Sequence, residues 1–544
     1  MISYLYVRIY VKIHTIVILV IALPLSSSFA GISQVKEVQS ILLVAESTEK
    51  PMSDEILWVD ADSDLGEFIL HHGFLHGRDE NSPAPNESLV ALLKPREWRL
   101  YKAPSYALAQ LHQANITYGL SDHYAWSQGG FPYAEPWTDW SEYEAYILYN
   151  LQVYDSYFPD YPVEYYDIWN EPDHPYFWHG TYDQLLETFA RCYNVVKSYN
   201  PQAKLVGPSI SWFRPGHPGV EGIMDFIVDL DSIYGVRLDA VSWHENGGTW
   251  IDTRPDGIPG RAQYLRSQIQ AHFPSDYTPE LHVNEFMGKQ VHLSPGWNLG
   301  YLYYLDKAEI DKAMRACWWI YSEDPYDYWC DCWFGLNGMF MKDGETPQPA
   351  YWVWLAYAQM EGETKLDILS SDVNTNLMAT RNDSSHIIKL LVGRYLKASP
   401  NDVIIHVVDY PYSQQSVLVK VERIPNYPEF YSDPPTAIPL PEGPLFAFSE
   451  LIPVVDGNIQ ITLEDFEDGD AYILIISVAH GDVNGDVVIN SADIVYLINY
   501  LFKGGPPPEP LQVGDVNCDQ VINSSDVVYF INYLFKGGPP PGGE

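Results

Sequence analysis

The chain reads YDIWNEP at residues 166–172, where an apolar run ends in an Asn-Glu-Pro triplet. A short apolar run that stops at polar residues is typical of a buried strand in a parallel sheet. In a barrel of alternating strands and helices, the carboxyl ends of the strands form the face that carries the chemistry. We therefore expect Glu171 to project into the mouth of a barrel, with Asn170 beside it.

The same alternation continues on both sides of this motif. Short apolar runs and amphipathic stretches follow one another from about residue 56 to residue 362, and at least six of the runs end in polar or aromatic residues. Strand–helix alternation over such a length is the signature of a parallel α/β domain. The polar run ends favour an eightfold (β/α)8 barrel over a doubly wound sheet. Because no G-x-G-x-x-G follows the first strand, a dinucleotide-binding domain has no support.

The sequence pattern changes twice after the predicted barrel. Residues 363–479 contain short β-branched runs punctuated by Asn, Asp, Ser and Pro, which is typical of an all-β sandwich. Residues 480–544 contain an internal repeat, in which GDVNGD at 481–486 returns as GDVNCD at 514–519. The predicted order is therefore a barrel at 56–362, a β-sandwich and a small helical repeat module.

The amino-terminal residues follow the pattern of a secretory signal peptide. Basic residues precede an apolar run at about residues 16–23, and the small residues Ser28 and Ala30 suit cleavage after position 30. Because the apolar run is too short to span a membrane comfortably, we expect a cleaved signal peptide at 1–30, a lead segment at 31–55 and a secreted protein. A retained membrane anchor is the alternative.

Composition narrows the classes of partner. The formal net charge is −41, and phosphate binding needs a basic face, so neither a nucleic acid nor an anionic membrane is expected as a partner. The 17 Trp and 41 Tyr residues suit the apolar faces of sugars as well as a protein core. Charge and aromatic content are thus compatible with a carbohydrate ligand.

A second glutamate ends a later strand candidate. Glu285 lies near the end of the apolar run LHVNEF at 281–286, 114 residues after Glu171 (285 − 171). Three strand–helix units fit this interval, which places the two glutamates on strands four and seven, across the barrel mouth. Retaining glycoside hydrolysis needs a protonated acid and an ionised nucleophile about 5–5.5 Å apart. Burial of the acid and mutual repulsion can separate the two pKa values.

Each copy of the carboxyl-terminal repeat contains a twelve-residue loop with oxygen-bearing side chains at positions 1, 3, 5, 9 and 12. Oxygen ligands at these positions suit Ca²⁺, and the backbone carbonyls of Val488 and Val521 would supply position 7. The Gly expected at position 6 is replaced by Val487 and Gln520, and the Glu expected at position 12 by Asp. The side-chain ligands of the two expected ions are Asp482, Asn484, Asp486, Asn490 and Asp493, and Asp515, Asn517, Asp519, Asn523 and Asp526.

The glutamate motifs carry a resemblance to a known family. WNEPD at 169–173 and SWH at 242–244 resemble the clan A glycoside hydrolases, and more narrowly family 39, the β-xylosidase and α-L-iduronidase family. The resemblance spans about residues 56–478 and so includes the sandwich. It implies a retaining mechanism in which Glu171 is the acid/base and Glu285 the nucleophile, with no cofactor for catalysis.

The resemblance also implies contacts to the sugar. Asn170 would bind the 2-hydroxyl group, His244 would lie near the nucleophile and His76 near the non-reducing sugar. The segments around residues 71–98 and 324–333 depart from the family pattern, so the identity of the sugar does not transfer. The substrate-binding residues expected are Asn170, His244, His76, His123 and Trp319.

The sequence thus predicts a glycosidase that acts on plant or algal-type oligo- or polysaccharides, with β-xylosidase-like specificity as the leading interpretation. A β-galactosidase, an α-L-arabinosidase or a uronic-acid hydrolase on the same barrel is the first alternative, and a non-catalytic carbohydrate-binding protein the second. The duplicated loop–helix units resemble type I dockerins, which implies a cohesin-bearing scaffold protein as a partner. A calcium-stabilised spacer without a partner is the alternative for this tail.

Overall fold

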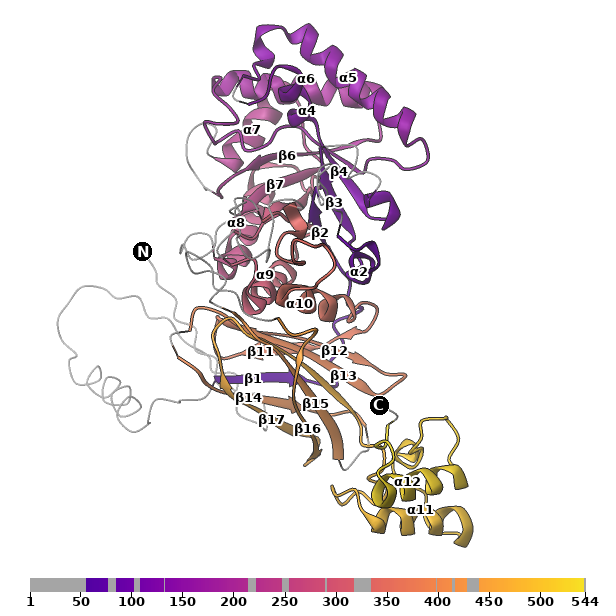
Figure 1. Cartoon of the computed structure of the whole chain (residues 1–544). Helices are drawn as coiled ribbons and strands as arrows, with labels where there is room; N and C mark the ends of the chain where they lie inside the picture. Colours follow the sequence, from indigo (N-terminus) through magenta and orange to yellow (C-terminus); the bar gives the residue numbers. More distant parts are fainter. Residues whose placement is uncertain are drawn as a thin grey trace, which may run out of the picture. The chain divides into compact units, whose positions relative to one another are not determined.

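The structure is a computed structural model (Figure 1). The expected signal peptide at 1–30 lies outside the described residues, and so does Trp319. In the part of the chain that is described, no helix combines the length and apolarity needed to cross a membrane. The described residues are 55–542 except 77–84, 102–107, 132, 214–221, 247–253, 289–290, 318–333, 398, 413–415 and 428–439.

Eight parallel strands close a barrel in their order along the chain, from β2 to β9, and β9 pairs with β2. The predicted (β/α)8 barrel is therefore confirmed, and the two glutamates belong to its fourth and seventh strands. The strands are β2 (His72–Leu75), β3 (Glu97–Leu100), β4 (Asn115–Gly119), β5 (Tyr165–Asp167), β6 (Lys204–Ile210), β7 (Ala240–Glu245), β8 (Glu280–Phe286) and β9 (Lys312–Arg315).

Helices surround these strands (Figure 1), and α6 and α7 among them are clearly amphipathic. In α6, the apolar residues Leu185, Phe189, Cys192 and Val196 recur at helical spacing and are buried, and Thr181 begins the helix with a capping box. These buried side chains pack in one core with the apolar residues of the barrel strands. The helices are α2 (Glu87–Leu92), α4 (Leu120–Ser127), α5 (Trp140–Tyr157), α6 (Tyr182–Tyr199), α7 (Ile223–Tyr234), α8 (Ile258–His272), α9 (Pro295–Lys307) and α10 (Pro349–Ala358), with 3-10 turns at Pro136–Thr138, Pro255–Gly257 and Phe334–Leu336.

The predicted sandwich is also confirmed, as two packed sheets with the strand orders β11-β1-β14-β17 and β10-β12-β13-β18-β15-β16. Alternate residues of its strands point into one apolar core, as in Val403, Ile405 and Val407. The strands are β1 (Glu55–Asp60), β10 (Thr364–Lys365), β11 (Asp367–Ser370), β12 (Thr375–Asn382), β13 (Ile387–Arg394), β14 (Asn401–Val408), β15 (Ser416–Ile424), β16 (Leu445–Pro453), β17 (Ile459–Phe466) and β18 (Ala471–Val478).

The first strand corrects the expected start of the barrel at residue 56. β1 pairs in parallel with β14 and antiparallel with β11, so it belongs to the sandwich although it precedes the barrel in the chain. Its buried side chains, Leu57 and Val59, join the sandwich core. The barrel closes without it, because β2 to β9 already supply its eight strands.

The carboxyl-terminal repeat folds as two loop–helix units, with α11 (Ser491–Lys503) and α12 (Ser524–Lys536). Each helix ends at a glycine in the left-handed region, Gly504 with φ 70° and Gly537 with φ 68°, where a residue with a Cβ is disfavoured. Leu497 and Phe530 pack the two units around one small core.

Candidate active site

Glu171 lies four residues beyond β5, in a strained backbone conformation. Its φ is 45°, in the left-handed region that non-glycine residues rarely adopt, and its backbone N–H donates to the Ser209 carbonyl at 2.9 Å. Such a conformation costs on the order of 1–3 kcal/mol and is found mostly at functional sites. The surrounding structure therefore holds this glutamate in place at a cost in stability.

The strain is shared by residues at or just beyond the carboxyl ends of several other barrel strands. Four more non-glycine residues at this face have a positive φ, after β2, in β6, after β8 and after β9. These residues are His76 (55°), Ser209 (54°), Met287 (82°) and Cys317 (54°). Non-glycine residues with a positive φ also precede β3, β4 and β9, so the conformation by itself does not single out this face of the barrel.

Glu285 lies on β8 with 2% of its surface exposed, and two donors reach its carboxylate. Arg99 Nη1 on β3 forms an ion pair with Oε1, and Asn246 Nδ2, which follows β7, donates to Oε2 at 2.9 Å. The Arg99 guanidinium also donates to Asp167 on β5 at 2.8 Å and to Asn170 at 2.8 Å. One buried arginine thus joins side chains of the second, fourth and seventh strands.

His244 lies between the two glutamates. Its Nδ1 is 2.8 Å from Glu171 Oε1 and 3.7 Å from Glu285 Oε2. One oxygen of each carboxylate and this nitrogen all lie within 4.8 Å of one another. The two carboxylates therefore approach closely enough to act on the two sides of one bond.

The environment assigns different protonation states to these groups. Burial, reinforced by the negative charge of Asp173, raises the pKa of Glu171 to about 7, against the smaller opposing effects of His174 and Arg99. Burial lowers the pKa of His244 to about 4, although the charge of Glu285 opposes the change. At neutral pH the imidazole is therefore uncharged, and Glu171 can carry a proton.

A second set of buried polar groups supports Arg99. Ser209 Oγ donates to Asp167 Oδ1 at 2.9 Å, and Asn284 Nδ2 donates to Asp167 Oδ2 at 3.0 Å. The sequence did not point to these four residues, which are Arg99, Asp167, Ser209 and Asn284. The one available signal was Arg99 itself, because a charged residue inside a short apolar strand needs a buried partner.

The structure brings three of the expected sugar contacts to this group. Asn170 accepts hydrogen bonds from Arg99 at 2.8 Å and from Tyr101 Oη at 3.4 Å. The His76 ring lies 4.9 Å from the Tyr101 ring, and His244 touches Glu171 as described. Asn170, His76 and His244 thus gather around the two glutamates and their arginine.

His123 packs against the barrel wall. Its ring packs 5.0 Å from the ring of Tyr118, which also contacts Tyr154 on α5, so it lies between the barrel wall and the outer helices. The described ring contacts of His123 are thus with an aromatic side chain of the barrel wall, and its contact with the sugar stays a prediction.

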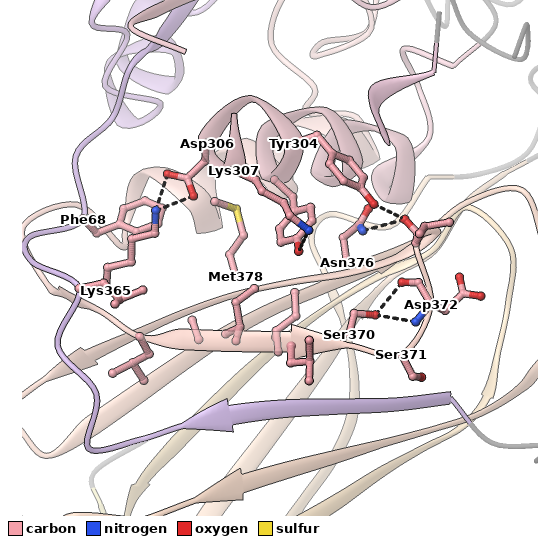
Figure 2. A pocket seen from close by; sticks show the side chains of 18 residues that line it. Phe68, Tyr304, Asp306, Lys307, Lys365, Ser370, Ser371, Asp372, Asn376 and Met378 are labelled. Carbon is pink, nitrogen blue, oxygen red and sulfur yellow. Dashed lines mark hydrogen bonds and ion pairs between the residues drawn. The ribbon is translucent and has the colours of Figure 1, made fainter. Parts of the chain in front are cut away.

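A cavity of about 280 Å³ lies between α9 and the sandwich strands β11 and β12 (Figure 2). Its lining includes Tyr304, Asn376 and Met378, and Asp306 and Lys365 form an ion pair at its rim. None of the residues that surround the glutamates lines it. It is therefore a feature of the contact between barrel and sandwich, separate from the candidate active site.

The two loops of the tail have the geometry expected of cation-binding loops. The buried position-12 residues Asp493 and Asp526 accept backbone N–H bonds from positions 3 and 9 of their own loops, at 2.8–3.2 Å. Asp482 Oδ1, at position 1, is buried without a hydrogen-bond partner among the described residues. Position 6 has a φ of 67° at Val487 and 69° at Gln520, the conformation for which glycine is usual. The donor set fits a hard cation such as Ca²⁺.

Position 9 of each loop also begins the helix that follows. The side-chain oxygen of Asn490 accepts the Ala492 N–H at 2.7 Å and begins α11, and Asn523 does the same for Ser525 at 2.7 Å. An amide oxygen has two lone pairs, so the cap leaves one of them for an ion or for a bridging water molecule. Asn490 and Asn523 therefore stay predicted ligands.

Residues 480–535 match the family profile of the dockerin type I domain. The tail predicted from the repeat is therefore a dockerin domain. The profile covers only this part of the chain, and no curated protein matches the sequence.

The barrel and sandwich share their fold with solved structures that include glycoside hydrolases. N2152 from Neocallimastix frontalis aligns with 19% identity over 78% of this chain and 100% of its own, with a TM-score of 0.61. The GH39 enzyme from Xanthomonas axonopodis pv. citri aligns with 14% identity over 80% and 100%, with a TM-score of 0.55. A monomeric β-xylosidase from Caulobacter crescentus CB15 aligns with 14% identity over 78% and 99%, with a TM-score of 0.53. The fold is thus that of family 39 and related clan A glycosidases.

Proposed function

We propose that this chain is a retaining glycoside hydrolase with Glu171 as acid/base and Glu285 as nucleophile. The observation that carries the proposal is the approach of these carboxylates, from two different barrel strands, to within 4.8 Å. Retaining enzymes hold their carboxyl groups about 5–5.5 Å apart, whereas inverting enzymes leave about 6.5–9.5 Å for a water molecule. The short separation favours direct attack on the sugar and gives no reason to prefer a purely sugar-binding protein.

The arrangement supports a double displacement. Protonated Glu171 gives its proton to the glycosidic oxygen while Glu285 attacks the anomeric carbon, so that the bond to the leaving group breaks and a glycosyl ester of Glu285 forms. Ionised Glu171 then removes a proton from water, which attacks the same carbon and releases Glu285. Neutral His244 would orient the Glu171 carboxyl through its 2.8 Å contact.

The substrate we propose is a plant or algal-type oligo- or polysaccharide, with a β-xyloside as the leading candidate. The fold that the chain shares with a β-xylosidase supports this choice. A β-galactoside, an α-L-arabinoside or a uronide on the same barrel is the alternative.

The test is hydrolysis of a panel of aryl xylosides, galactosides, arabinosides and glucuronides, with the anomeric product followed by NMR. We expect at least one substrate to be hydrolysed with retention of configuration. Because the acid must be protonated and its pKa is about 7, kcat/KM should fall about tenfold per pH unit above pH 7.

The Glu171→Ala variant gives the matched comparison. It should lose the alkaline limb of the pH profile, and azide should restore part of its turnover of activated aryl glycosides, since azide attacks the glycosyl ester without a base. Inversion of configuration, or an alkaline limb that persists in Glu171→Ala, would contradict the assigned role.

For the dockerin domain we propose two bound Ca²⁺ ions and a cohesin-bearing scaffold protein as partner, with a secreted location for the whole protein. The support is the dockerin profile and the repeated oxygen-lined loops. A spacer without a partner would not need two loop–helix units of the same sequence and geometry.

Removal of calcium should unfold the tail and leave the barrel folded. At a calcium concentration about 1,000 times Kd, each bound ion would stabilise the folded tail by about 4 kcal/mol. With EGTA we expect rapid proteolysis after residue 480, which Ca²⁺ should reverse and Mg²⁺ should not. The glycosidase activity should stay unchanged throughout. In the presence of calcium, Asp526→Ala should produce about half of the loss of protease resistance that EGTA causes in the wild type. Resistance to proteolysis that EGTA does not change would contradict the calcium assignment.

A further inference from the structure

Asp122 is a carboxyl group at the barrel mouth that the proposed mechanism does not use. It is the third residue of α4, which begins directly after β4. Ser121 Oγ donates to Asp122 Oδ1 at 3.2 Å, and the same hydroxyl accepts the backbone N–H of Asn170 at 3.2 Å. One hydroxyl group therefore ties Asp122 to the residue that precedes Glu171.

The charged groups that face Asp122 are those of the active site. Burial raises the pKa of Asp122 to about 7, Arg99 opposes the change, and the negative charges of Glu285 and Asp167 add to it. The charge of Asp122 also contributes to the raised pKa of the Tyr101 phenol. Through Ser121, whose hydroxyl accepts the backbone N–H of Asn170, Asp122 is held next to the residue that binds Arg99.

Asp122 has hydrogen-bonding capacity left over. Ser121 is its one hydrogen-bond donor among the described residues. The Arg99 guanidinium donates to Asp167, Glu285 and Asn170, and no hydrogen bond from it to Asp122 is seen among the described residues. The Asp122 side chain is only partly buried. A carboxyl group can take part in several hydrogen bonds at once, and Ser121 uses one of these positions.

We propose that Asp122 binds hydroxyl groups of the reacting sugar and makes the site selective for neutral over anionic sugars. This inference rests on the proposed glycosidase function. A carboxylate accepts hydrogen bonds from two neighbouring sugar hydroxyls, and such charge-assisted bonds are stronger than neutral ones. A uronic acid would instead bring its carboxylate towards Asp122, Glu285 and Glu171, whose one described cation, Arg99, is already paired. Of the alternative substrates, uronides are thereby disfavoured.

The experiment compares kcat and KM of wild type and Asp122→Asn for the preferred neutral aryl glycoside and for the aryl glucuronide. The asparagine side chain keeps the shape and loses the charge. We expect a 10- to 100-fold lower kcat/KM on the neutral sugar, mostly through KM, as for the loss of a hydrogen bond to a charged group (~10–100-fold). The preference for the neutral sugar over the glucuronide should fall by at least tenfold, about one charge-assisted bond.

The matched control is Asp183→Asn. Asp183 is also an acidic residue in the first turn of a barrel helix, α6, but it is exposed. Both substitutions remove a favourable charge from a helix amino terminus, so a general effect on helix stability would appear in both. Asp183→Asn should keep the wild-type constants and the wild-type selectivity.

Two results would overturn the inference while the glycosidase function stands. One is unchanged kcat/KM on both substrates in Asp122→Asn, and the other is an equal loss on neutral and anionic substrates, which a structural role would produce. If the wild type hydrolyses no glycoside, the proposed function fails, and calorimetric titration with xylose and with glucuronate tests Asp122 separately. Xylose should then bind the wild type more tightly than glucuronate does, and an unchanged preference in Asp122→Asn would refute the role.

Discussion

Glu285→Gln should lower kcat on every glycoside that the wild type hydrolyses by on the order of 10⁵-fold, equivalent to about 7 kcal/mol of transition-state stabilisation. The amide keeps the volume of the carboxylate and can still contact Arg99 and Asn246. It cannot form the glycosyl ester, because an amide oxygen is a far weaker nucleophile than a carboxylate. The loss should therefore appear in kcat, with KM little changed.

The control for this substitution lies on the same strand. Glu280→Gln alters the opposite end of β8, where Glu280 pairs with His282 at 3.0 Å, and should leave kcat unchanged. A 2-fluoro glycoside should label Glu285 in the wild type and leave Glu285→Gln unlabelled by mass spectrometry. A label on any other residue would assign the nucleophile elsewhere.

Arg99→Met should be the most destabilising single change at the site, with a loss of about 3–5 kcal/mol in the free energy of unfolding. Arg99 is fully buried and pairs with Asp167 and Glu285, which are themselves buried. Removing the guanidinium leaves two carboxylates without a counter-charge in a region that water does not reach. Chemical denaturation followed by tryptophan fluorescence measures the effect.

The double variant Arg99→Met with Glu285→Gln separates charge from packing. Because Glu285→Gln removes one of the two uncompensated charges, the double variant should be more stable than Arg99→Met alone by more than about 1 kcal/mol, a non-additive result typical of contacting residues. Simple additivity of the two changes would mean that the ion pair contributes little. Arg99→Lys, which keeps the charge but has fewer donors, should lie between wild type and Arg99→Met.

The sequence was sufficient wherever the signal is local. The Asn-Glu-Pro triplet after an apolar run predicted a catalytic strand end, and its distance from Glu285 predicted strands four and seven of a barrel. The repeat predicted the dockerin loops, because their ligand spacing lies within twelve residues. These features need no knowledge of which distant segments pair.

The features that the sequence did not predict depend on such pairing. β1 has the apolar pattern of any buried strand, and only its partners, β11 and β14, decide to which sheet it belongs. Arg99 matters because β3 comes close to β8, 186 residues further along the chain. Asp122 was not singled out, because its link to Asn170 through Ser121 joins residues 49 positions apart in the chain.

The place of β1 in the sandwich governs the order in which the protein can fold during synthesis. Glu55 pairs with Val403 of its parallel partner, 348 residues later (403 − 55), and the whole barrel is made in between. At about 5–20 residues per second, the strand waits roughly 20–70 s for its neighbour. The barrel can close while this segment is still unpaired, whereas the sandwich must take up the first described residues of the chain after nearly all the others have been made. Deletion of the chain up to residue 60 would leave all eight barrel strands in place. The sandwich would lose β1, so β11 and β14 would each have an open edge that could pair with another chain.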